Sequence, residues 1–168
     1  MTYRKIRFDF KYCKSDESDR FFRTLLVKKD LNLLNFGIAI VQAFKGQLTH
    51  SFTFEKGNES YIPPYFEYAS EGEHFMQNYT VEDLGKKFTF CYDLGDGWYF
   101  NAKVYSKEVE DSYEDEDGEE QDVVLIDGAG QGIWEDTCGT APRHDLGAVH
   151  LSCRWPVADA GATGRNGG

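Results

Sequence analysis

Two short glycine-containing stretches hold most of the residues whose types and spacing could do chemistry. The first is Asp93-Leu94-Gly95-Asp96-Gly97, followed directly by Trp98, and the second begins at Asp127. Carboxylates gathered in loops can bind a hard cation such as Mg²⁺ or Ca²⁺ through oxygen. The candidate metal ligands are therefore Asp93, Asp96 and Asp127. An aspartate in a tight turn also commonly accepts hydrogen bonds from the amides of that turn, which is the simpler interpretation of Asp93 and Asp96. We predict no cofactor, with a divalent cation as the alternative.

The second stretch, D-G-A-G-Q-G-I-W-E-D at 127–136, supplies five more candidate binding residues, Gly128, Gly130, Trp134, Glu135 and Asp136. It follows an apolar strand-like run, so a phosphate-binding loop is the natural comparison. No Lys-Ser/Thr pair follows, and the glycine spacing G-x-G-x-G differs from both known phosphate-loop patterns. The sequence therefore favours a structural glycine-rich loop here.

His50 is the remaining candidate, because it follows the predicted helix at 31–45 and lies near the beginning of the predicted strand at 48–55. A hydrogen-bonded structural role is the simpler interpretation of a single histidine in that position. The four cysteines (Cys13, Cys91, Cys138 and Cys153) form no C-x-x-C pair and lack the basic neighbours that would activate a thiolate. We therefore expect reduced thiols in a cytoplasmic protein.

The negative charge is concentrated in one segment. The net charge is −11, and residues 108–122 hold ten acids and no base, so the rest of the chain carries −11 + 10 = −1. We predict a solvated, mobile acidic loop on a nearly neutral body. The sequence shows no evident nucleic-acid-binding patch and no apolar run long enough for a membrane span.

The candidate residues need a scaffold, and the pattern of hydrophobic residues predicts one. Alternating residues at 88–104 indicate a β-hairpin, and similar patterns indicate further strands. A helix over 31–45, with Asp30 as N-cap, is apolar on most sides and so should be buried. The remaining predicted elements are strands at 3–12, 20–28, 48–55 and 123–126, an irregular segment at 56–79, and a short helical turn that begins at Thr80.

The predicted fold class is α+β, a twisted, mainly antiparallel sheet packed against one long buried helix plus short helices. Residues 1–139 should form a single domain that carries the acidic loop at 108–122. The last segment, 140–168, has no Phe, Tyr, Ile, Lys or Glu, although the chain before it is rich in aromatic residues. We predict that 140–168 is a poorly ordered tail.

Three motifs together point to a family. They are L-x-x-F-x-x-A-I-V-Q-A-F at 33–44, Y-D-L-G-D-G-W at 92–98, and D-G-x-G-x-x-x-W-E-D-x-x-G at 127–139. In these motifs the chain resembles the plasmid Ri open-reading-frame-three-like family, also labelled insertion-element passenger or TnpR-like protein, over roughly residues 3–139. The resemblance implies a sheet packed on helices and makes His50 the counterpart of a family histidine. A second family histidine is replaced by Phe100, and Cys138 stands where the family has glycine.

These observations lead to two functional hypotheses. The first is a cytoplasmic binding or interaction module associated with plasmids or mobile elements, with a protein partner or with a homodimer formed through the 31–45 helix. The alternative is a metal-dependent hydrolase or nuclease that uses the carboxylates of the 93–96 turn and the 127–136 loop. The absence of a histidine at position 100 counts against the second hypothesis.

Overall fold

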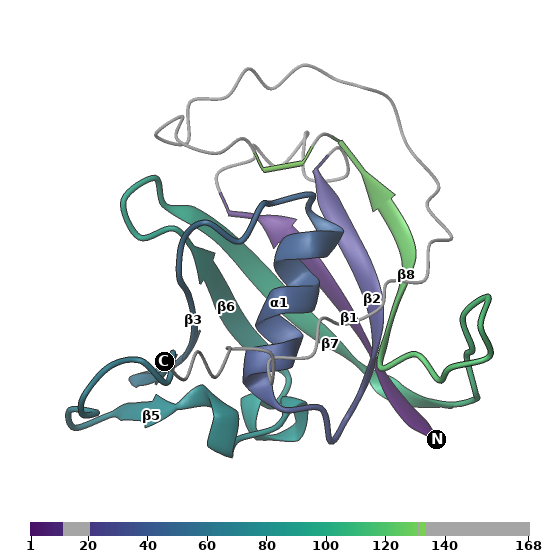
Figure 1. The fold of residues 1–168 in the computed structure, drawn as a ribbon, viewed down its shortest axis with the longest axis horizontal. Coiled ribbons are helices and arrows are strands. Elements are labelled where there is room, and N and C mark those ends of the chain that lie inside the picture. Colours follow the sequence, from purple (N-terminus) through teal and green to yellow (C-terminus); the bar gives the residue numbers. More distant parts are fainter. Residues whose placement is uncertain (12–20, 131, 134–168) are drawn as a thin grey trace, which may run out of the picture.

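The protein is built around one eight-stranded sheet with the strand order β5-β4-β3-β6-β7-β1-β2-β8 (Figure 1). The computed structural model describes residues 1–11, 21–130 and 132–133. The strands are β1 (Thr2–Phe10), β2 (Phe22–Lys28), β3 (Phe52–Lys56), β4 (Glu59–Ile62), β5 (Glu73–Phe75), β6 (Lys87–Tyr92), β7 (Trp98–Glu110) and β8 (Val123–Ala129). The described helices are α1 (Leu33–Ala43) and two 3₁₀ turns, η2 (Met76–Asn78) and η3 (Val81–Leu84). All neighbouring strands are antiparallel except β4 and β5, which are parallel.

The predicted α+β class is wrong, because the described chain is mainly β, with a single α-helix set against a large mixed sheet. The helix is also shorter than the predicted 31–45. Its N-cap is Asn32, whose side chain accepts a hydrogen bond from the amide of Asn35, so Asp30 is not the cap. Asn32 can take this role because a backbone turn at 28–31 and a bridge to Thr80 hold the chain extended just before the helix.

The segment 56–79 is not irregular as predicted, because it contains β4, β5 and η2. Pro63-Pro64 falls between the two strands, where it interrupts neither. The short helical turn after Thr80 is confirmed as η3, where Thr80 and Asp83 form a reciprocal capping box. The predicted hairpin is confirmed as β6 and β7, joined by residues 93–97.

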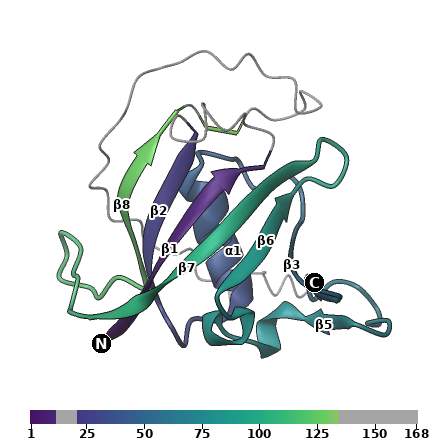
Figure 2. The ribbon, with the colours of Figure 1, turned by 180° about the vertical axis from the view of Figure 1, so that it is seen from behind.

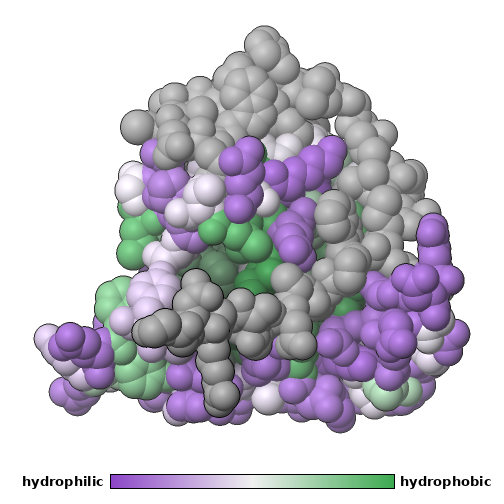
Figure 3. All heavy atoms as spheres, in the orientation of Figure 1, coloured by the Kyte–Doolittle hydropathy of each residue, from purple (hydrophilic) through white to green (hydrophobic). Residues whose placement is uncertain are grey.

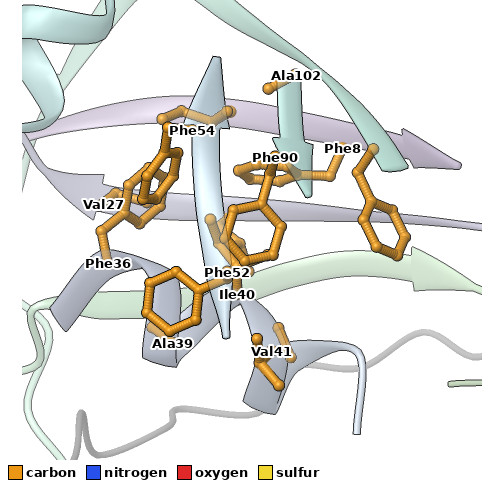
Figure 4. Close-up of a cluster of buried hydrophobic side chains, with 14 of the residues drawn as sticks. Phe8, Val27, Phe36, Ala39, Ile40, Val41, Phe52, Phe54, Phe90 and Ala102 are labelled. Carbon is orange, nitrogen blue, oxygen red and sulfur yellow. The ribbon is translucent and has the colours of Figure 1, made fainter. Parts of the chain in front are cut away.

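The main core lies between α1 and the face of the sheet that it covers (Figure 1). It is unusually aromatic, and the rings of Phe36, Phe54 and Phe90 from three elements meet there (Figure 4). No residue of α1 is exposed, which confirms the prediction of a helix buried on most sides. In the space-filling view, hydrophobic residues show over this face, whereas the region of the acidic loop is hydrophilic (Figure 3).

The opposite face of the sheet has no helix across it in the described part of the chain (Figure 2). We call it the open face. A small second cluster of Tyr3, Leu26 and Val124 lies at one end of it, and Tyr113 packs edge-on against Tyr3 at 5.3 Å between ring centroids. Tyr113 belongs to the acidic loop, so this contact fastens the loop to the sheet.

The acidic loop is more organised than the mobile connector we predicted. Asp115 accepts hydrogen bonds from the amides of Asp117 and Glu119 and from the side chain of Gln121. The hydroxyl of Tyr3 donates to the carbonyl of Gln121, and Lys28 forms ion pairs with Glu120 and Asp122. The loop therefore folds on itself and is held at the end of the sheet where Tyr3 lies.

No helix among the described residues is long and apolar enough to cross a membrane. The predicted tail at 140–168 lies outside the described residues.

Gly37 lies where α1 packs closely against the Phe52 ring of β3, and replacing it with alanine should destabilise the protein. A Cβ atom at Gly37 would lie 2.0 Å from Cε2 of Phe52. Alanine at an exposed helix position would stabilise by up to about 1 kcal/mol relative to glycine. Overpacking outweighs that gain here, so we expect a net loss of about 1–3 kcal/mol.

Urea denaturation of Gly37→Ala would measure the loss, and the double variant with Phe52→Leu is the matched comparison. The smaller side chain should recover part of the loss, since it removes the ring that the new methyl group meets. Strictly additive effects of the two substitutions would contradict the proposed clash.

Candidate functional site

One end of the sheet gathers the segments that hold most of the predicted site residues. Because β6, β7, β1, β2 and β8 are successively antiparallel, the 93–97 turn lies at the same end as the last residues of β8. The start of β3 is there as well, since Phe52 pairs with Tyr92. The C-terminal end of α1 reaches the same region, where the carbonyl of Phe44 accepts from the amide of Ile133.

Asp93 organises the turn between β6 and β7. Its carboxylate oxygen Oδ1 accepts from the amides of Gly95 and Asp96 at 3.0 and 3.2 Å, and its side chain is almost completely buried. The amide of Gly97 donates to the Asp93 carbonyl at 2.7 Å. These bonds are the turn contacts that the simpler interpretation predicted for Asp93. Asp96, three residues further along the same turn, is partly exposed.

His50, just before β3, lies beside Asp93, which directly follows β6. Its Nε2 atom lies 3.4 Å from the second carboxylate oxygen, Oδ2 of Asp93. The backbone supports this pairing, because the amide of Asp93 donates to the carbonyl of Ser51 and the amide of His50 lies 3.4 Å from the hydroxyl of Tyr92. Asp93 thus holds both its own turn and the ring of His50, an arrangement that orients the imidazole.

The backbone around this pair is strained. In the described chain, the non-glycine residues with a left-handed φ are Lys45 at 60°, Leu48 at 58° and Asp93 at 54°. All three lie in the two segments that meet at His50, namely 45–50 and 93–97. We call these segments the two-loop site. Such conformations cost free energy and are concentrated at functional sites. Two leucines of this site, Leu48 and Leu94, are exposed.

The structure separates Asp127 from this site. Asp127 pairs with Thr24, and the same cross-strand row continues through Arg7 and Lys103 to Lys87 at the beginning of β6. Asp93 lies six residues further along, which is about 20 Å in the strand direction alone. Asp127 and Asp93 therefore cannot share one cation. Among the described residues, no group of three or more His, Cys, Asp or Glu side chains could hold a metal ion.

The other predicted residues have different positions. Trp98 is buried in the core beside Phe10 and Phe21, so it does not face a ligand. Gly128 and Gly130 border the side chain of Arg23, and a Cβ at Gly128 would lie 2.8 Å from Cδ of that arginine. Trp134, Glu135 and Asp136 lie outside the described residues.

Arg23 is a central residue that sequence reasoning missed. It is almost completely buried, and it donates to four backbone carbonyl groups, those of Phe22, Ala43, Ala129 and Gly130. Burial lowers the pKa of Arg23 to about 10, so the guanidinium stays charged at neutral pH. Its position inside an apolar strand, RFFRTLLVK, was the signal that could have identified it, because an arginine pointing inward needs polar partners.

Cys91 is a buried residue on the open-face side of β6, and its thiol leads to a prediction about stability at alkaline pH. Burial raises the pKa of the Cys91 thiol to about 11, whereas an unfolded chain would ionise it near 9. Between these values the unfolded state releases a proton that the folded state keeps, so stability should fall as the pH rises from about 9 to 11. The expected slope is at most about 1.4 kcal/mol per pH unit.

Denaturation of the wild type and of Cys91→Ala at pH 8 and 10.5 would isolate this contribution. The alanine variant should lose less stability over the same interval. Equal losses in both proteins would show that other groups account for the alkaline instability.

A model of the family described as plasmid pRiA4b ORF-3-like protein matches residues 11–149. The chain belongs to this family. Membership in the plasmid pRiA4b ORF-3-like family agrees with the resemblance seen in the three sequence motifs.

The fold of this family member has a counterpart among solved structures. It is similar to a protein of unknown function, MM3350, from Methanosarcina mazei Go1, with a TM-score of 0.65 and 16% sequence identity. The match covers 81% of this chain and 74% of the other. At this identity the likeness concerns the fold alone. Among curated proteins, none matches the chain.

Proposed function

We propose that this plasmid pRiA4b ORF-3-like protein is a cytoplasmic binding module associated with mobile elements, of the kind labelled insertion-element passenger or TnpR-like. Its ligand contacts the two-loop site, where His50, oriented by the buried Asp93, supplies a polar group and Leu48 and Leu94 supply apolar surface. The observation that carries the proposal is the left-handed φ of three non-glycine residues in the two segments of this site, Lys45, Leu48 and Asp93.

The rest of the fold supports this proposal. Binding residues are commonly placed on loops that a rigid scaffold positions, and here a large sheet with an aromatic core holds both loops. The exposed leucines beside a half-buried imidazole combine apolar contact with a directional hydrogen-bonding group. A protein or peptide partner uses such mixed surfaces, so it is the class of ligand that we propose.

Chemical-shift mapping on ¹⁵N-labelled protein would test the site. The panel should contain short peptides with apolar and acidic side chains, common nucleotides, and Mg²⁺, Mn²⁺, Ca²⁺ and Zn²⁺. We expect peptides to shift amide signals in 45–50 and 93–97. Leu94→Ser should weaken that binding, whereas Tyr68→Ser, at another exposed hydrophobic position, should leave it unchanged. Binding that perturbs only other regions would overturn the proposal.

The metal arm of the panel tests the alternative function. A rise in melting temperature with a divalent cation, abolished by Asp96→Asn, would favour a metal-dependent hydrolase or nuclease over a binding module. Among the described carboxylates of this alternative, Asp93 and Asp96 share one turn, whereas Asp127 lies across three intervening strands.

A further inference from the structure

The open face carries a row of cations that strand pairing brings together. Lys87 of β6 pairs with Lys103 of β7, and Lys103 pairs with Arg7 of β1. Neighbouring strands are about 4.8 Å apart, so these three side chains stand side by side on one face of the sheet. Lys5 lies two residues from Arg7 on the same face, and Lys11 directly follows the end of β1.

Like charges directly opposite one another in a sheet are destabilising. Acidic side chains neutralise only part of the positive charge of this row. Asp9 forms an ion pair with Arg7 at 2.9 Å, but the strand partners of Lys103 are Lys87 and Arg7. At the open-face positions of the three central strands β6, β7 and β1, four cations (Lys5, Arg7, Lys87 and Lys103) stand against one acid, Asp9. The central part of the open face is therefore positive although the whole chain carries −11.

Aromatic rings are interleaved with these cations. The Nζ atoms of Lys5 and Lys103 lie 4.9 and 5.9 Å from the centre of the Tyr105 ring, and Nζ of Lys11 lies 5.4 Å from that of Tyr99. Tyr99 and Tyr105 are six residues apart on β7, and thus about 20 Å apart along the strand. Tyr105 is 36% exposed, so its ring is accessible at the surface.

We propose that the open face binds single-stranded nucleic acid. The cation row would contact successive phosphates, and the tyrosines would stack against bases, a combination that is typical of single-strand binding surfaces. A base that stacks on Tyr105 would displace a flexible lysine from the ring, and that lysine would be free to meet a phosphate. Tyr99 borders Gly97 of the two-loop site, but the cation row lies about 20 Å along the strands from Asp93, so the proposal does not depend on the function proposed there.

The partner follows from the chemistry of the face. An acidic peptide would form ion pairs with the cations but would offer no base for the tyrosines to stack on. A duplex keeps its bases stacked inside, so the same rings would have nothing to stack on. The acidic loop lies at the Tyr3 end of the face, which directs a polyanion toward the end near Tyr99.

Fluorescence anisotropy with the full chain would test this proposal, using labelled (dT)₁₅, a 15-base-pair duplex and poly-glutamate as probes. We expect (dT)₁₅ to bind more tightly than the other two. If about three phosphates are neutralised, its affinity should fall about 20-fold between 50 and 200 mM salt. Equal binding of poly-glutamate or of the duplex would overturn the assignment to single strands, as would the absence of binding.

Lys103→Glu is the decisive variant, because it should weaken (dT)₁₅ binding about tenfold or more while raising the melting temperature. The higher melting temperature would follow from new attractive pairs with Lys87 and Arg7, and it would exclude misfolding as the cause. Lys29→Glu, in the turn after β2, changes the net charge equally and should bind like the wild type. If the two variants behave alike, the cation row is not the site.

Tyr105 provides an independent test of stacking. Tyr105→Ala should weaken (dT)₁₅ binding about fivefold or more, whereas Tyr105→Phe keeps the ring and should preserve it. Unchanged binding by the alanine variant would contradict the role of the ring.

Discussion

Replacing Arg23 with methionine is expected to lower the free energy of unfolding by about 3–5 kcal/mol. Methionine keeps much of the apolar stem but provides no donor for the carbonyls of Phe22, Ala43, Ala129 and Gly130. These carbonyls belong to the start of β2, the end of α1, the end of β8 and the residue that follows β8. The loss should therefore be larger than that of a single hydrogen bond, because three elements lose their common partner.

Urea denaturation monitored by far-UV circular dichroism would measure this effect. Arg4→Met is a suitable control, because Arg4 forms ion pairs with Glu82 and Glu108 at the surface. Exposed pairs of this kind are worth about 1 kcal/mol or less. Arg23→Lys should lie between the two, since an ammonium group keeps the charge but not the planar fork of donors. Similar losses for Arg4→Met and Arg23→Met would contradict the central role of Arg23.

Trp98→Ala should also be severely destabilising, by about 3–5 kcal/mol. The indole is 3% exposed, and its ring centroid lies 5.4 Å from that of Phe10 and 6.3 Å from that of Phe21. Removing it would leave a large cavity at the end of the core that supports the 93–97 turn. Trp98→Ala therefore tests whether the two-loop site rests on this part of the core.

Trp98→Phe is the informative comparison for this second prediction. Among the described residues the indole nitrogen has no hydrogen-bond partner, so phenylalanine removes a buried donor as well as some volume. We expect it to lose less than half of what alanine loses, as measured by thermal and urea unfolding. Near-normal stability of Trp98→Ala would instead mean that Trp98 contributes little to packing.

Local sequence patterns were sufficient for some elements of the fold. The hairpin of β6 and β7 was predictable, because strict alternation flanks a turn that contains two glycines. The fold class was not, because β4 and β5 are short strands in a segment rich in Pro, Gly and Tyr. Their parallel pairing is a non-local property that no local periodicity reveals.

The candidate sites show the same division. The turn contacts of Asp93 could be anticipated from its place in D-L-G-D-G, whereas its contact with His50 depends on the register of β3 against β6. The cation row was invisible for a similar reason. Arg7 and Lys103 are distant in the sequence and become neighbours only through the pairing of β1 with β7.

The fixed position of the acidic loop makes the molecule an electric dipole. Tyr3, Lys28 and Asp115 hold the acids at one end of the open face, beyond the positive row at Arg7 and Lys103. A charged molecule that approaches will feel a torque before contact, and a polyanion will arrive with the loop turned away from it. At physiological salt, where the Debye length is about 8 Å, this torque acts only at short range. In dilute buffer it should orient encounters over several times that distance.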